Sequence, residues 1–213
     1  MFKFYFQQKL TITLGNIYYA IFTSVMEMSF LILSGLLILV ALLALFDGLY
    51  LHLIRYQLQN QADSRLEHLT HTVRAIFFPI ILYLLFLNHN QAISFITGSL
   101  VVFLDIVALG IDAFSEKDSR AFMGGLPRWE YILHLFVNGF HFALIAVFLA
   151  VKINISDYEF TLVSDFNQVL NFKYFEKIVR LVLPGSILFA IVHILLAIPN
   201  INNYWNTKFV NKI

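Results

Sequence analysis

The chain has 213 residues, of which 60% are hydrophobic and 13% are charged, and its mean hydropathy is +0.78. A composition this apolar excludes a soluble globular domain and is typical of a membrane protein with several spans. The net charge of +1 gives no support for nucleic-acid binding, and the lack of cysteine excludes disulfides, thiolate zinc sites and iron–sulfur clusters.

Residues 1–27 mix aromatic side chains with Lys and Gln, so we expect an N-terminal interfacial segment. Five later stretches are apolar enough to cross about 30 Å of hydrocarbon, which takes about 20 helical residues. They lie near 28–54, 67–88, 92–113, 130–152 and 177–199, and residues 200–213 form a C-terminal tail. The sequence therefore predicts an all-α integral membrane protein with one transmembrane domain. The distribution of Lys and Arg favours an outside N-terminus and a cytoplasmic C-terminus.

An Asp-Ser-Arg triplet occurs twice, at 63–65 and at 118–120, each time before an even-numbered span. Each copy leads to a Glu-x-x-x-His pair, Glu67/His71 and Glu130/His134. We expect the first four spans to form two hairpins that are diverged copies of each other and that pack as a four-helix bundle. The fifth span contains Pro184, which removes a backbone hydrogen bond, so we expect a kinked helix outside that bundle.

Ionisable side chains within the spans point to a functional site. A charged group at the centre of a bilayer costs about 2.5–3.5 kcal/mol on insertion scales unless it is paired, hydrated or bound to an ion. Residues four apart share a helix face, and their positions along the spans place these groups in the same half of the bundle. The predicted ligands of a site for two divalent ions are Asp47, Glu67, His71, Asp105, Glu130 and His134. Additional ligands or residues that support the ligands are expected among Asp112, His141, His193 and Arg74.

Oxygen and imidazole ligands without sulfur suit iron, manganese or zinc. The set is similar in chemistry to the ferritin-like dimetal carboxylate proteins, in which two helices supply Glu-x-x-His. The spacing here is Glu-x-x-x-His, so we take only the coordination logic from that resemblance. Bridging carboxylates accommodate a change in metal charge, which favours iron over zinc and manganese.

These ligands suggest a membrane metalloenzyme that acts on a lipid-soluble substrate, with iron-dependent oxidoreductase chemistry favoured. Three alternatives stay open: a zinc-dependent lipid hydrolase, a b-type haem protein that uses two of the histidines, and a non-enzymatic subunit or proton- or ion-translocating protein. Membrane lipid is the expected partner. Three cations at the mouth of the site could bind a headgroup phosphate, namely Arg65, Arg120 and Arg128.

Several of these residues also have a purely structural interpretation. Glu67 completes a capping box with Ser64, and Asp47 and Asp105 could each pair with an arginine, Arg74 or Arg120. Asp112, at the end of a span, could be solvated, and His141 and His193 could form interhelical hydrogen bonds.

The other histidines are expected at the membrane surface. His52 lies about 140° around an α-helix from Asp47, and His68 lies about 100° from the stripe that carries Glu67. His89 falls in the short connection between the second and third spans, where we expect it to be solvated.

Overall fold

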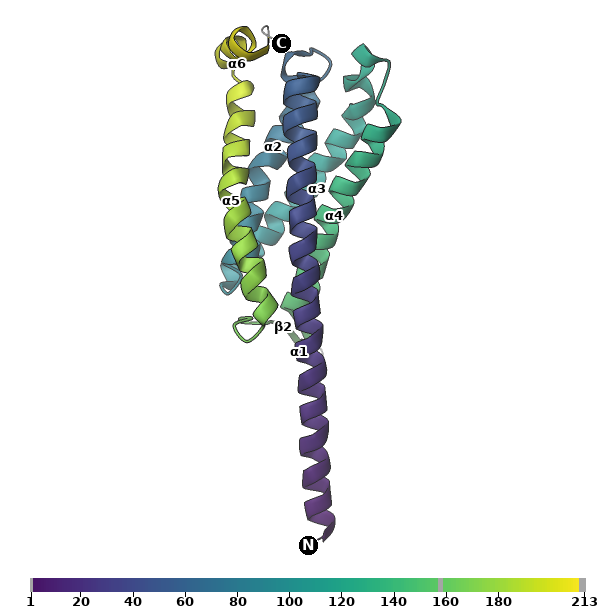
Figure 1. Cartoon of the computed structure of the whole chain (residues 1–213), viewed down its shortest axis with the longest axis vertical. Helices are drawn as coiled ribbons and strands as arrows, with labels where there is room; N and C mark the ends of the chain where they lie inside the picture. Colours follow the sequence, from purple (N-terminus) through teal and green to yellow (C-terminus); the bar gives the residue numbers. More distant parts are fainter. Residues whose placement is uncertain (1, 157–158, 211–213) are drawn as a thin grey trace.

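The computed structural model describes residues 2–156 and 159–210, and it is almost entirely helical (Figure 1). Five helical segments are long and apolar enough to cross a membrane, as the sequence predicted. They are Tyr19–Arg55, Arg65–Leu87, Ala92–Met123, Arg128–Lys152 and Leu170–Leu196. The orientation of the chain across the bilayer stays a prediction.

The elements follow one another in this order: α1 (Phe2–Ala44), η1 (Leu45–Arg55), η2 (Leu58–Asn60), α2 (Arg65–Ile81), η3 (Leu82–Leu87), α3 (Ala92–Ser119), η4 (Ala121–Met123), α4 (Arg128–Lys152), β1 (Ile153–Ser156), β2 (Glu159–Leu162), α5 (Leu170–Leu196), α6 (Pro199–Trp205) and η5 (Asn206–Val210). Two elements extend membrane helices as π-helices, η1 after α1 and η3 after α2. Strands β1 and β2 form an antiparallel hairpin that pairs Ile153 with Leu162.

The five long helices pack in the order α3, α2, α5, α1 and α4, rather than as a four-helix bundle with an external fifth helix. Helix α5 packs against both α1 and α2, while the other extensive contacts are those of α1 with α4 and of α2 with α3. The expectation that span five lies outside is therefore wrong, because α5 fills the space between the two helices of the first predicted hairpin. The structural repeat of the two hairpins and a bend at Pro184 stay predictions.

The helical bundle has an apolar half and a polar half. Near the start of α5, the core is rich in aromatic residues, and the buried Phe30 ring contacts Phe166, Phe172 and Phe175 with centroids 4.8–5.8 Å apart. Near the end of α5, buried carboxylates, imidazoles and guanidinium groups replace these rings. This second half contains the candidate site.

Helix α1 runs without a break from Phe2, and its N-terminal part extends beyond the other helices (Figure 1). The structure gives no boundary at residue 27, and an interfacial role for residues 1–27 stays a prediction. Glu27 caps the start of α5, because its two carboxylate oxygens accept hydrogen bonds from the backbone N–H groups of Leu170 and Asn171, each at 2.7 Å. This contact satisfies N-terminal donors that would otherwise lack partners.

His89 is buried, so the expectation that it is solvated is wrong. Its exposed fraction is 3%, and its ring lies among Phe148, Phe166 and Phe172. The buried Lys152 ammonium lies 3.2 Å from His89 Nδ1 and also donates to the carbonyl of Val163. Burial of the ring, followed by the nearby Lys152 charge, lowers the pKa of His89 to about 4.

Candidate metal centre

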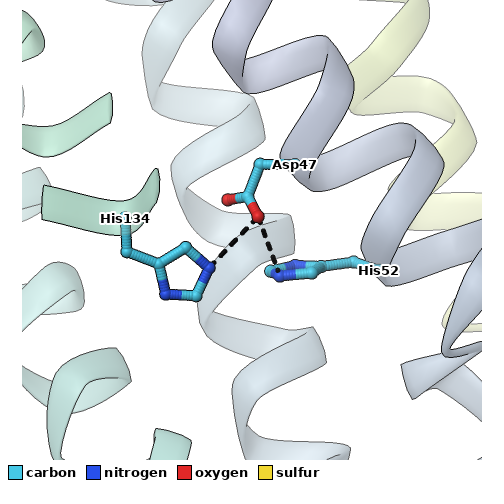
Figure 2. A group of neighbouring side chains, drawn as sticks. All are labelled: Asp47, His52 and His134. Atoms are coloured by element: carbon cyan, nitrogen blue, oxygen red, sulfur yellow. Dashed lines mark hydrogen bonds and ion pairs between the residues drawn. The ribbon is translucent and has the colours of Figure 1, made fainter. Parts of the chain in front are cut away.

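Asp47 and two histidines form the first group of candidate ligands. One Asp47 carboxylate oxygen lies 3.1 Å from His134 Nε2 and 3.3 Å from His52 Nε2, and Figure 2 shows both rings facing this oxygen. Glu116 Oε1 lies 2.7 Å from the other ring nitrogen of His134. A carboxylate behind a histidine fixes the tautomer and direction of the ring, which is the usual arrangement of metal-binding histidines.

His52 belongs to this group because the segment around it is a π-helix. In η1 the hydrogen bonds join residues five apart, so Tyr56 N–H donates to the Leu51 carbonyl at 2.8 Å. This winding brings residue i+5 closer to the direction of residue i than an α-helix does. His52 is therefore turned toward Asp47 and is 1% exposed. Its prediction as a membrane-surface residue is wrong.

Glu67, His71 and His52 form a second group. Glu67 Oε1 lies 3.8 Å from His71 Nε2 and 3.9 Å from His52 Nε2. The Asp112 carboxylate lies 3.2 Å from the same His71 nitrogen, and Thr70 donates a hydrogen bond of 2.6 Å to its other oxygen. Asp112 is 2% exposed, so the alternative that it is solvated is wrong. The two groups share only His52 Nε2, and the atoms of each group lie close enough together to bind one ion.

Arg120 neutralises two glutamates in the middle of the protein. It is fully buried, and it donates to Glu67 Oε2 at 2.7 Å and to Glu130 Oε1 at 2.6 and 3.0 Å. The headgroup-binding role predicted for Arg120 is therefore wrong. Glu130, a predicted metal ligand, instead shares the arginine with Glu67. Nearby Tyr56 packs under the guanidinium group, and burial followed by the Glu130 charge raises the pKa of its hydroxyl.

Ser64 does not form the predicted capping box with Glu67. Its hydroxyl donates instead to the Ser119 carbonyl at 2.7 Å, and no side-chain cap hydrogen bond occurs at the start of α2. Glu67 is thus free of a local backbone role and is directed into the protein. The other two predicted headgroup ligands, Arg65 and Arg128, are exposed, and their role stays a prediction.

A second polar level lies nearer the middle of the predicted spans. Asp105 Oδ2 lies 3.0 Å from His141 Nε2, and Asp105 Oδ1 accepts from Arg74 Nε at 3.4 Å. Arg74 also donates to Asn138 Oδ1 at 2.9 Å. Asp105 therefore has the arginine partner that the structural interpretation of the sequence allowed. It pairs with Arg74 and His141 and belongs to neither candidate ion group.

His193 and His68 form a separate buried pair. Their rings stack with centroids 5.7 Å apart and planes 19° apart, and they are 1% and 6% exposed. Within the described part of the chain, neither ring nitrogen of His193 has a hydrogen-bond partner. The expectation that His68 is interfacial is wrong, and His193 lies beside the centre without contacting a carboxylate among the described residues.

The polar half carries a large excess of negative charge. Among the described residues that face it, six carboxylates stand against two guanidinium groups, which leaves four negative charges when the imidazoles are neutral. The carboxylates are those of Asp47, Glu67, Asp105, Asp112, Glu116 and Glu130, and the cations are Arg74 and Arg120. Unpaired charges are strongly unfavourable in a medium of low dielectric constant. Two divalent cations, or four protons, would neutralise this excess.

A cavity of about 290 Å³ adjoins the centre. Its lining includes polar groups from both levels, among them Asp47, His71, His134 and Arg74, together with apolar side chains of α1 and α5. Gly48 allows close packing here, because a Cβ at this position would lie 2.6 Å from the Phe189 ring. The centre is therefore open to a small or slender ligand.

Glu116 is the ligand-supporting residue that the sequence analysis missed. It lies four residues after Asp112 and eleven after Asp105, the same stripe spacing that identified His134 and His141 relative to Glu130. The helical periodicity of α3 could therefore have predicted it.

Comparisons of the chain with protein-family models, with curated proteins and with solved structures find no match, so the function of the site rests on its own geometry and chemistry.

Proposed function

We propose that this protein is an integral-membrane metalloenzyme in which two divalent cations act on a lipid-soluble substrate held in the adjacent cavity. The observation that carries the proposal is the pair of ligand groups around His52, set in a buried region where carboxylates outnumber guanidinium groups by four. The excess of carboxylates over guanidinium groups and the two groups of converging ligands both support two divalent ions.

The first ion is assigned to Asp47, His52 and His134, with Glu116 supporting His134 from behind. The second ion is assigned to Glu67 and His71, which lie within reach of the same His52 nitrogen. We assign His52 to the first ion, and the Asp112 carboxylate, 3.2 Å from His71 Nε2, supports the second. The first ion then has three protein ligands and the second has two with Asp112 beside them, which leaves positions for substrate or water.

The ligands favour iron, with zinc and manganese as the other candidates. Bound iron would supply redox chemistry on the substrate, whereas bound zinc would polarise a carbonyl or activate water for hydrolysis. A haem site is less consistent with the geometry, because His52, His71, His134 and His141 each direct Nε2 toward a carboxylate oxygen.

Metal analysis of the purified protein tests the proposal. We expect two ions per chain in the wild type, and loss of one ion in each of His134→Ala and His71→Ala. His52→Ala should also lose metal, while the matched control His89→Ala, altered at a buried histidine in the apolar half, should keep both ions. Equal metal content in His52→Ala and His89→Ala would refute the assignment.

A second candidate function follows from the same excess charge. If the wild-type protein binds no metal, four protons must neutralise the cluster, and the chain would then be a proton-binding membrane protein with linked Asp–His pairs. A wild-type protein that is free of metal after expression in metal-supplemented medium would overturn the metalloenzyme proposal and support this alternative.

A further inference from the structure

The cavity has two polar levels along the axes of α3 and α4. Asp112 and His134 lie at the level of the candidate ions, and Asp105 and His141 lie seven residues away on the same two helices. Seven residues of α-helix correspond to about 10 Å. A ligand that reaches both levels must therefore be elongated.

Apolar side chains line the cavity over the same length. They include Val40, Ala41 and Ala44 of α1, Leu45 of η1, and Leu181, Val182 and Phe189 of α5. Residues 40–45 of α1 and η1 and residues 181–189 of α5 cover a helix length similar to the distance between the two polar levels. The chemistry of this lining suits a hydrocarbon chain or ring, since pockets for small molecules combine such surface with a few directed polar groups.

The level of Asp105 and His141, called the inner level, is electrically balanced, which disfavours an anionic ligand. Arg74 donates to Asp105 and Asn138, and its remaining nitrogen lies 3.7 Å from Asp112. The arginine charge is thus compensated by neighbouring carboxylates. A fatty-acid carboxylate or a phosphate at this level would meet Asp105 without an available cation to pair with.

Two polar atoms of the inner level are left for a ligand, and their hydrogen-bonding roles follow from their neighbours. Arginine can only donate, so the Asn138 oxygen faces Arg74 and its amide nitrogen is a free donor. A carboxylate accepts, so the His141 Nε2–H donates to Asp105. In a neutral imidazole the other nitrogen, Nδ1, is then an acceptor. Within the described residues, neither of these two atoms has a partner. Both residues line the cavity, and a hydroxyl supplies the acceptor and the donor that these two atoms require.

We infer that the cavity binds an uncharged lipid through a hydroxyl group held by Asn138 Nδ2 and His141 Nδ1, with the apolar part of the lipid against α1 and α5. The inference names the substrate class of the proposed enzyme and rests on that proposal for the reaction, but binding itself does not require the ions. A ketone or an ether oxygen would leave His141 Nδ1 without a donor.

Photolabelling in phosphatidylcholine vesicles tests this site. A diazirine analogue of hexadecanol should label residues 40–45 and 181–189, and unlabelled hexadecanol should suppress the labelling. Hexadecanoic acid and hexadecyl methyl ether should compete about tenfold less well, as expected for the loss of one buried hydrogen bond. Equal competition by the three compounds, or labelling centred on a lipid-facing residue such as Phe114, would overturn the inference.

Variants separate this inference from the proposed metal function. Asn138→Leu and His141→Phe should each weaken the competition by hexadecanol about tenfold while keeping the wild-type metal content, because neither residue belongs to the two ion groups. The control Asn88→Leu, far from the cavity, should behave as wild type. Selective labelling in a metal-free protein would sustain the lipid site and refute the metalloenzyme. Two bound ions together with unselective labelling would sustain the metalloenzyme and refute the lipid site.

Discussion

Arg120 is the buried cation on which the stability of the polar half depends most directly. Its side chain has no exposed surface, and its guanidinium nitrogens lie 2.6–3.0 Å from carboxylate oxygens of Glu67 and Glu130. Replacing it in Arg120→Met keeps most of the side-chain volume but removes the charge. Two buried carboxylates then lose their cation.

Breaking a buried ion pair from one side costs about 3–5 kcal/mol, because the remaining charge cannot be hydrated. For a chain of this size, 1 kcal/mol corresponds to about 2–4 °C in Tm, so Arg120→Met should lower Tm by about 6–20 °C. The matched control is Arg180→Met. Arg180 pairs with Glu176 at 2.6 Å but is 63% exposed, so its loss should cost about 0.3–0.5 kcal/mol.

Thermal unfolding in detergent, with a chelator present, measures both variants under metal-free conditions. The triple variant Arg120→Met, Glu67→Gln, Glu130→Gln removes the two carboxylate charges as well, and it should recover most of the lost Tm, because a buried ion network can be replaced by neutral groups at little cost. The reasoning is refuted if Arg120→Met is no less stable than Arg180→Met, or if the triple variant is no more stable than Arg120→Met.

Three further changes test other contacts. Gly48→Ala places a methyl group against the Phe189 ring and should cost about 1–3 kcal/mol of unfolding free energy. Adding Phe189→Leu should restore part of that loss. If urea unfolding shows that the loss in the double variant equals the sum of the two single losses, the two residues do not touch. Glu27→Ala removes the cap of α5 and should cost about 0.5–2 kcal/mol, whereas an unchanged Tm would contradict the capping contact. The pKa of His89 is lowered from 6.5 to about 4 in the folded protein, so its neutral ring stabilises the fold fully above pH 6.5 and this contribution is lost as pH falls toward 4. In His89→Phe the fall in Tm over this pH range should be smaller, and an identical pH profile would show that another group controls it.

The sequence by itself determined the class of the protein and the residues that needed an explanation. Apolar runs of about 20 residues can satisfy their backbone groups within hydrocarbon only as helices, so five membrane helices followed from composition and length. The cost of burying ionisable groups then marked Asp47, Glu67, His71 and His134 as candidates. The structure brings these four together around His52.

What only the tertiary structure decided was the partner of each group. The predicted side-chain directions assume α-helical hydrogen bonds, and the π-helix η1 changes those directions. His52 therefore faces Asp47 instead of the membrane surface. Arg120 and His89 lie near helix ends, where sequence alone predicts exposure, but neighbouring helices and the loop after α4 cover them. Asp112 rather than Asp105 faces His71, because the packing of α3 on α2 sets which of two carboxylates on one stripe lies at that depth. Local periodicity specifies the face of a helix, whereas depth, cover and pairing arise from contacts between residues distant in the chain.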